Sequence, residues 1–251
     1  MKYNKFGPVS ISESGNYDSI KSMGPLTINA PAVTAESIKA MGPASLKSTL
    51  EADKININGP GSGEGSIKVG TFKINGPFKY AGDISIKDAG KINGPCKVTG
   101  SFTGNSEVKF TINGPLEFQH MSDFNYIKVN GPTTGFSIKN VGTLGINGKV
   151  QLEEIEVSEQ VTINLGKGET VIKSIKGGNI EIGILEDTNS FFGRLFKNVV
   201  SEDSKVRVGI IESIESNGVV ELDNVKVKKV IAKELFAGEN TEIGEFIELT
   251  E

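Results

Sequence analysis

The chain has 251 residues, including 31 Gly, one Cys and no Trp, and a formal net charge of −4. A single Cys rules out an intrachain disulfide framework, which favours a reducing cytoplasmic location. No signal peptide and no run of 18 apolar residues is present, so the sequence predicts no membrane span. Residues 1–150 carry a net charge of +5 and residues 151–251 a net charge of −9. The basic half lacks an aromatic-basic stripe, so we expect no nucleic-acid partner.

A Gly-Pro pair recurs through the first half of the chain at intervals of 17 to 20 residues. Apolar and polar residues alternate on both sides of each pair, as in Phe72 and Ile74 before Gly76. A period of two indicates strands, and Gly-Pro between two strands indicates a corner. One repeat therefore predicts one coil of a parallel β-helix. The pairs begin at Gly7, Gly24, Gly42, Gly59, Gly76, Gly94, Gly114 and Gly131.

Beyond Gly148 the Pro is lost, but Gly166, Gly183, Gly209 and Gly244 continue the repeat. The sequence therefore predicts a single all-β domain over residues 1–251, with about 14 coils of 17–18 residues. The interval from Gly183 to Gly209 is longer than the others. We expect one inserted loop there, at about 187–203.

Six asparagines occupy the same position in successive coils, immediately before the corner glycine. Stacked amides at one position predict a structural ladder that bonds coil to coil. Metal binding by this column is not expected, because neutral amides do not replace carboxylates or imidazoles. The ladder comprises Asn58, Asn75, Asn93, Asn113, Asn130 and Asn147.

Residues that carry catalytic chemistry are few. His120 is the only histidine, and Cys96 lies in an apolar column with the pattern of a core thiol. The segment Gly61–Gly65 resembles a phosphate loop but lacks its Lys-Ser/Thr ending. A left-handed β-helix acyltransferase is an alternative that would use His120, but the chain lacks the six-residue repeat of that class. We therefore expect neither an enzyme nor a bound cofactor.

Three phrases of the sequence resemble the bactofilin family, the polymer-forming cytoskeletal proteins, and especially its longer bacillus-type members. They are Gly82-Asp83-Ile84, the segment 175–183 and the ending 238–248. The resemblance implies a right-handed, three-sided β-helix. It also implies end-to-end assembly into non-polar filaments without nucleotide.

The terminal coils are the predicted polymer interface, because the end of a solenoid leaves strand edges and apolar core uncovered. The expected partner is then a second copy of the chain. The alternative is a monomeric solenoid whose acidic last coil blocks stacking and which binds a protein or carbohydrate on one face. The residues predicted at the interface are Phe6, Val9, Ile11, Ile243, Phe246 and Ile247.

The segment 190–197 inside the expected loop has the pattern of a short amphipathic helix. Its apolar residues gather on one side of such a helix, and its two basic residues lie towards the other. This pattern predicts either a weak membrane or protein contact, which would hold filaments at a membrane, or packing of the loop on the solenoid. The residues are Phe191, Phe192, Arg194, Leu195, Phe196 and Lys197.

Overall fold

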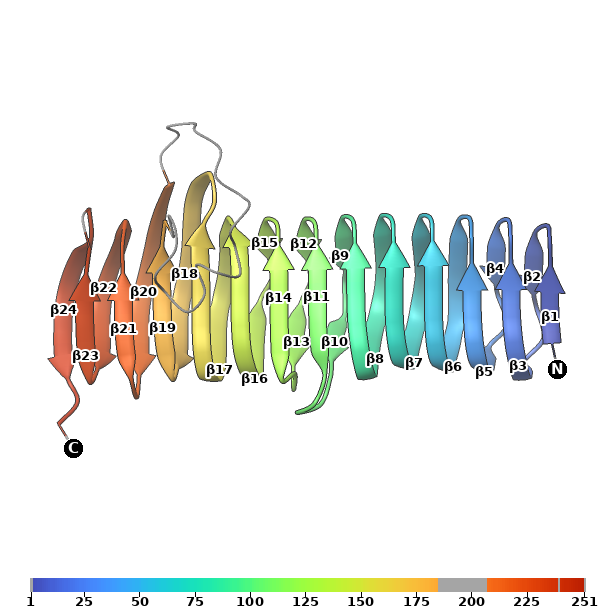
Figure 1. Ribbon diagram of the computed structural model, residues 1–251, viewed down its shortest axis with the longest axis horizontal. Coiled ribbons are helices and arrows are strands. Elements are labelled where there is room, and N and C mark those ends of the chain that lie inside the picture. Colours follow the sequence, from blue (N-terminus) through green and yellow to red (C-terminus); the bar gives the residue numbers. More distant parts are fainter. Residues whose placement is uncertain (1, 185–206, 239, 251) are drawn as a thin grey trace. The chain divides into compact units, whose positions relative to one another are not determined.

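The computed structural model describes residues 2–184, 207–238 and 240–250. Every regular element of these residues is a β-strand, and the strands pair in parallel as about 13 turns of a β-solenoid (Figure 1). The predicted all-β parallel β-helix is confirmed. The chain divides into two compact units, Met1–Lys128 and Val129–Glu251, which are described separately below. No helix in the described ranges is long and apolar enough to cross a membrane.

The described residues of unit 1 form thirteen complete strands, and a fourteenth spans the boundary with unit 2. They are β1 (Lys2–Lys5), β2 (Val9–Ile11), β3 (Gly15–Ser22), β4 (Leu26–Ile28), β5 (Ala32–Ala40), β6 (Ala44–Asn58), β7 (Gly61–Asn75), β8 (Phe78–Asn93), β9 (Cys96–Val98), β10 (Ser101–Thr103), β11 (Lys109–Asn113), β12 (Leu116–Glu117), β13 (His120–Ser122) and β14 (Tyr126–Asn130).

Each turn of unit 1 contributes residues to three paired columns, here named faces A, B and C. In the first turns, face A contains Val9–Ile11 paired with Leu26–Ile28, and face B contains 15–17 paired with 33–35. Face C contains Lys2–Lys5 paired with 19–22. The Gly-Pro corners connect face C to face A, as their sequence predicts.

The regular register of unit 1 follows from its repeat length. Every residue of β6 that pairs with β7 does so 17 positions later, from Ala44 with Gly61 to Asn58 with Asn75. The inward positions of these strands are apolar and almost fully buried, as at Leu46, Ile57 and Phe72. Alternation of apolar and polar residues therefore becomes a continuous core enclosed by the three faces.

Unit 2 has the same parallel construction. Its strands are β15 (Thr133–Thr134), β16 (Ser137–Gly148), β17 (Val150–Leu165), β18 (Gly168–Gly177), β19 (Asn179–Gly183), β20 (Arg207–Ser216), β21 (Val219–Leu222), β22 (Val225–Ala232), β23 (Glu234–Ala237) and β24 (Glu242–Glu248).

The pairing of β18 with β20 locates an insertion between consecutive turns of unit 2. Gly168 pairs with Arg207, 39 positions later, whereas Gly209 pairs with Val225, 16 positions later. The sequence pattern suggested that Gly209 continues the column of Gly183. The pairing shows that it does not. Gly183 pairs with Asn164 on face C, and Gly209 pairs with Thr170 on face A. The expected loop at 187–203 and the contact residues Phe191, Phe192, Arg194, Leu195, Phe196 and Lys197 lie outside the described residues.

Candidate interaction surfaces

The asparagine column of unit 1 is a chain of amide hydrogen bonds. Asn75 Nδ2 donates to Asn58 Oδ1 at 2.6 Å, and Asn93 Nδ2 donates to Asn75 Oδ1 at 2.7 Å. Asn113 Nδ2 continues the series to Asn93 Oδ1 at 2.8 Å. Each amide inside the series is both donor and acceptor, so the column links consecutive turns at the corner. In unit 2, Asn147 is paired in register with Asn164.

Several of the corner glycines, from Gly59 to Gly148, have backbone angles that suit only glycine. Gly76 has φ of 150° and Gly94 has φ of 140°. A Cβ added at Gly76 would lie 2.6 Å from the carbonyl oxygen of Gly59 in the preceding turn. The Asn-Gly pair therefore combines a hydrogen-bonding side chain with a close approach of the backbones of neighbouring turns.

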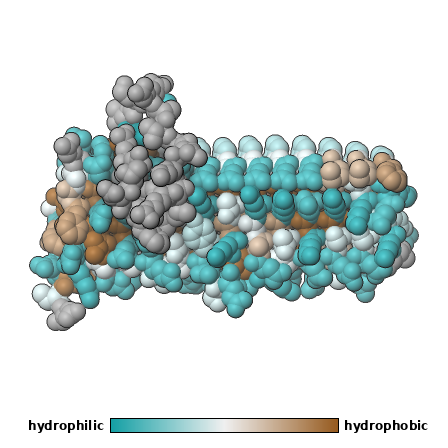
Figure 2. Space-filling model, in the orientation of Figure 1, coloured by the Kyte–Doolittle hydropathy of each residue, from teal (hydrophilic) through white to brown (hydrophobic). Residues whose placement is uncertain are grey.

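The same column becomes apolar towards the start of unit 1. Asn58 Nδ2 lies 3.2 Å from Met41 Sδ, and Met23 and Phe6 occupy the preceding two turns. Their exposed fractions increase along the column: 41% at Met41, 57% at Met23 and 96% at Phe6. Figure 2 shows this short apolar stretch at the end of a row of hydrophilic side chains. The sequence analysis singled out Phe6 but missed the two methionines, although both immediately precede Gly-Pro.

The glycine-rich segment 61–65 is part of strand β7 and not a phosphate loop. A Cβ added at Gly61 would lie 2.8 Å from the ring of Phe78, and one at Gly63 would meet first the backbone carbonyl of Leu46 in the preceding turn and then the ring of Tyr80 at 3.0 Å. These glycines therefore leave room for two buried aromatic side chains of the next turn, which stack with a centroid separation of 5.8 Å. The segment has a packing role in the core.

The residues considered for catalysis are not brought together. His120 is exposed at the start of β13. Cys96 is buried in face A between Phe78 and Leu116, and burial raises the pKa of its thiol to about 12. Within the described ranges, no group of three or more His, Cys, Asp or Glu side chains is placed to hold a metal ion.

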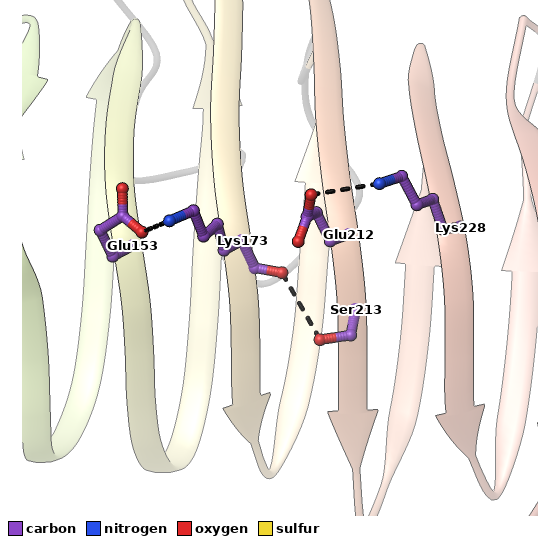
Figure 3. Close-up of polar contacts among 5 residues, drawn as sticks. All are labelled: Glu153, Lys173, Glu212, Ser213 and Lys228. Atoms are coloured by element: carbon purple, nitrogen blue, oxygen red, sulfur yellow. Dashed lines mark hydrogen bonds and ion pairs between the residues drawn. The ribbon is translucent and has the colours of Figure 1, made fainter.

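Unit 2 carries ion pairs between successive turns on its outer surface. Glu153 on β17 pairs with Lys173 on β18, and Glu212 on β20 pairs with Lys228 on β22 at 3.1 Å (Figure 3). The Ser213 hydroxyl donates to the carbonyl oxygen of Lys173 at 3.5 Å. The hydrogen bond to Glu153 is the main reason that the pKa of Lys173 is raised. These side chains are largely exposed, so each pair adds little stability but opposes a shift in register.

The first turn of unit 1 presents one edge without a strand partner in the described residues. Strand β1 pairs with β3, and β2 pairs with β4. Val9 and Ile11 are buried, whereas Phe6 at the corner is almost fully exposed. The ring of Tyr3 packs against that of Tyr17 at a centroid separation of 5.8 Å.

The last turn of unit 2 also presents a strand edge. Strand β23 pairs with β21 and β24 pairs with β22, with no further strand beyond them among the described residues. Phe236 is 57% exposed and Phe246 is 42% exposed, although Phe246 is aligned with the fully buried Val230. Ile243 is half-buried and Ile247 is exposed. This edge therefore combines unpaired backbone with uncovered apolar side chains.

A shallow cavity of about 290 Å³ opens beside this last turn. Its apolar lining comes from three successive turns of face C and ends at the corner after β23. Exposed apolar surface beside a free strand edge is the arrangement expected of a protein contact. The lining residues are Glu181, Ile182, Glu221, Leu222, Asp223, Phe236, Ala237 and Gly238.

Comparison with known proteins adds no relative to these observations: no family model, curated protein or solved structure matches the chain.

Proposed function

We propose that the protein is a self-assembling scaffold whose copies associate through their terminal turns, without nucleotide or cofactor. The observation that carries this proposal is the last turn of unit 2, where Phe246 is exposed on a strand that, among the described residues, is paired on one edge only. A free parallel edge offers a row of backbone donors and acceptors to a further strand. The sequence resemblance to polymer-forming cytoskeletal proteins supports the same function and a cytoplasmic site of assembly.

The stacking of turns within each unit supplies the physical basis. Every turn buries its apolar face against its neighbours, so a terminal turn leaves one side of its core uncovered. A second copy that covers this side gains apolar burial and backbone hydrogen bonds together. Assembly of this kind requires no energy source other than the contact itself.

The substitution Phe246→Arg tests the proposal, because a charge buried at the interface without a partner opposes association. We expect a folded, soluble protein with a smaller sedimentation coefficient than wild type and no filaments in electron micrographs. Val171→Arg is the matched control, because Val171 is an exposed apolar residue on β18, away from the last turn. A wild-type protein that remains monomeric at all concentrations in the absence of nucleotide would refute the proposal.

A further inference from the structure

We propose that association is head to tail, with the first turn of one copy extending the last turn of the next and Phe6 entering the cavity beside Gly238. This inference rests on the proposed function and specifies which ends meet. It differs from the like-to-like arrangement that the family resemblance implies. The register, the cavity, the side-chain sizes and the charges of the two edges support it.

The Asn-Gly corner common to both units sets the register. In unit 1, Thr71 lies four residues before the ladder asparagine Asn75. Successive strand pairings align Thr71 with Lys2 in the first turn. In unit 2, the equivalent position is Thr143 before Asn147, and it is traced forward to Glu234. Strands β1 and β23 therefore occupy the same four positions of face C.

Extension of the parallel ladder from β23 of one copy to β1 of the next then fixes each opposed pair. Glu234 lies opposite Lys2, and the inward Leu235 lies opposite the inward Tyr3. The corner residue Phe6 lies opposite Gly238, one position beyond β23. The pair Lys2 and Glu234 is complementary in charge and the pair Phe6 and Gly238 in size, whereas Asn4 opposite Phe236 and Lys5 opposite Ala237 show no such match.

The cavity accounts for the exposure of Phe6. Asp223 and Gly238 line the cavity at the same corner column that Phe6 occupies in the first turn, and Leu222 and Ala237 line it one position earlier. A Cβ added at Gly238 would come 2.8 Å from Asp223 Oδ1, so only a glycine fits at this position beside the Asp223 carboxylate. A Phe ring exposed on one edge and an apolar cavity on the other are complementary surfaces.

Face B shows a second complementarity of size. Phe246 is at its first inward position in the last turn, aligned with Val230 and Ile214. The equivalent position of the first turn is Gly15, aligned with Val33. A Cβ added at Gly15 would meet only the Tyr17 ring, at 3.7 Å. Head-to-tail stacking thus places the largest side chain of one edge over the smallest of the other.

The charges oppose contact between identical ends. Strands β23 and β24 contain four carboxylates and no basic residue, whereas β1 contains two lysines and no carboxylate. Glu242 and Glu245 already pair with Lys226 and Lys229 of the preceding turn, so two last turns face to face would bring mainly Glu234 and Glu248 together, and two first turns would bring the lysines together. Opposite ends attract, which favours specificity for the head-to-tail contact. The carboxylates are Glu234, Glu242, Glu245 and Glu248, and the lysines are Lys2 and Lys5.

Disulfide trapping tests the arrangement directly. Ser10 is exposed at an outward position of face A, three residues after the corner glycine Gly7. Glu242 on β24 is exposed at the equivalent position of the last turn, as the strand pairings show. Paired strands lie about 4.8 Å apart, within the Cα separation of a disulfide. We therefore expect Ser10→Cys mixed with Glu242→Cys to give a cross-linked heterodimer under oxidation, identified by its disulfide-linked peptides. The native Cys96 is buried and serves as an internal unreactive thiol.

The outcomes separate this inference from the proposed function. Homodimers formed by either variant alone, or assembled protein without the heterodimer, would overturn the head-to-tail contact and leave self-assembly intact. Protein that stays monomeric in sedimentation would overturn both. As a second measurement, Phe6→Ala is expected to weaken association at least about tenfold, whereas Met23→Ala, one turn further from the edge, retains it. Unchanged association of Phe6→Ala would exclude Phe6 from the contact.

Discussion

Asn75 donates a 2.6 Å hydrogen bond to Asn58 and accepts one of 2.7 Å from Asn93, so its amide joins three successive turns. Because the three amides are half-buried at the corner, each depends on its neighbours for hydrogen-bond partners. Loss of one amide therefore leaves a donor on one side and an acceptor on the other without a protein partner.

Asn75→Ala is expected to reduce the free energy of unfolding by about 1–3 kcal/mol, because both adjacent amides lose a partner. Lys73→Ala is the matched control, since Lys73 is exposed two residues earlier on the same strand. Its expected effect is within about 0.5 kcal/mol. Urea denaturation of both variants measures the difference, and equal stability would show that water replaces the ladder without cost.

Gly76→Ala is expected to destabilise the protein by several degrees in Tm, because its Cβ would lie 2.6 Å from the Gly59 oxygen and its φ of 150° does not suit alanine. Gly7→Ala is the control, since a Cβ at Gly7 has no neighbour within 4 Å. Thermal unfolding followed by circular dichroism compares the two. Similar Tm values would indicate that the corner relaxes freely.

Tyr80→Phe is expected to stabilise the protein by about 1 kcal/mol. The Tyr80 hydroxyl is buried and has no hydrogen-bond partner in the described part of the chain, so its removal eliminates an unmet desolvation cost while the ring stays in place. The measurement is the urea midpoint at pH 7. A decrease in the midpoint would mean that the hydroxyl has a partner such as an internal water.

The buried thiol of Cys96 is expected to make the folded protein less stable at alkaline pH. Burial raises the pKa of its thiol from 9.0 to about 12 in the folded state, so the folded state holds the proton more tightly than the unfolded state. The resulting stabilisation is complete below about pH 9 and is lost as pH rises towards about 12. Cys96→Val removes this contribution, so its stability is expected to decrease less than that of wild type between pH 8 and 10.

Thiol labelling provides an independent measurement on Cys96. We expect iodoacetamide to modify wild-type protein at pH 8 in urea but not in buffer. The reactive species is the thiolate, and burial in the native protein both disfavours the thiolate and keeps the reagent away from the sulfur. Rapid labelling of the native protein would place the thiol at the surface and contradict the buried position.

The sequence pattern was sufficient to predict the fold because one local rule repeats. Phe72, Ile74 and the corner at Gly76 recur with substitutions in turn after turn, so an error at one repeat does not change the interpretation of the others. The prediction from the repeat was wrong at the insertion between Gly183 and Gly209. Gly183 and Gly209 look equivalent in sequence, but the partner of each is decided by which face its strand joins, and this depends on the length of chain between the turns.

Features that depend on contacts between turns were less accessible from sequence. The Gly61–Gly65 segment was interpretable only once the Phe78 and Tyr80 rings were placed beside it. Met23 and Met41 substitute for asparagine in the ladder, and their exposure follows from the corner geometry more than from their hydrophobicity. The cavity beside Gly238 is formed by residues of three turns together, so no single segment of the sequence predicts it.

The constant offset of 17 positions between β6 and β7 has a consequence for how such a chain can change in length. Removal or duplication of one whole period in this region leaves every remaining residue on its original face, with the same kind of neighbour above and below. Tandem duplication of a short gene segment would therefore yield a longer protein that is foldable at once, and the lengths of related chains are expected to differ by whole turns.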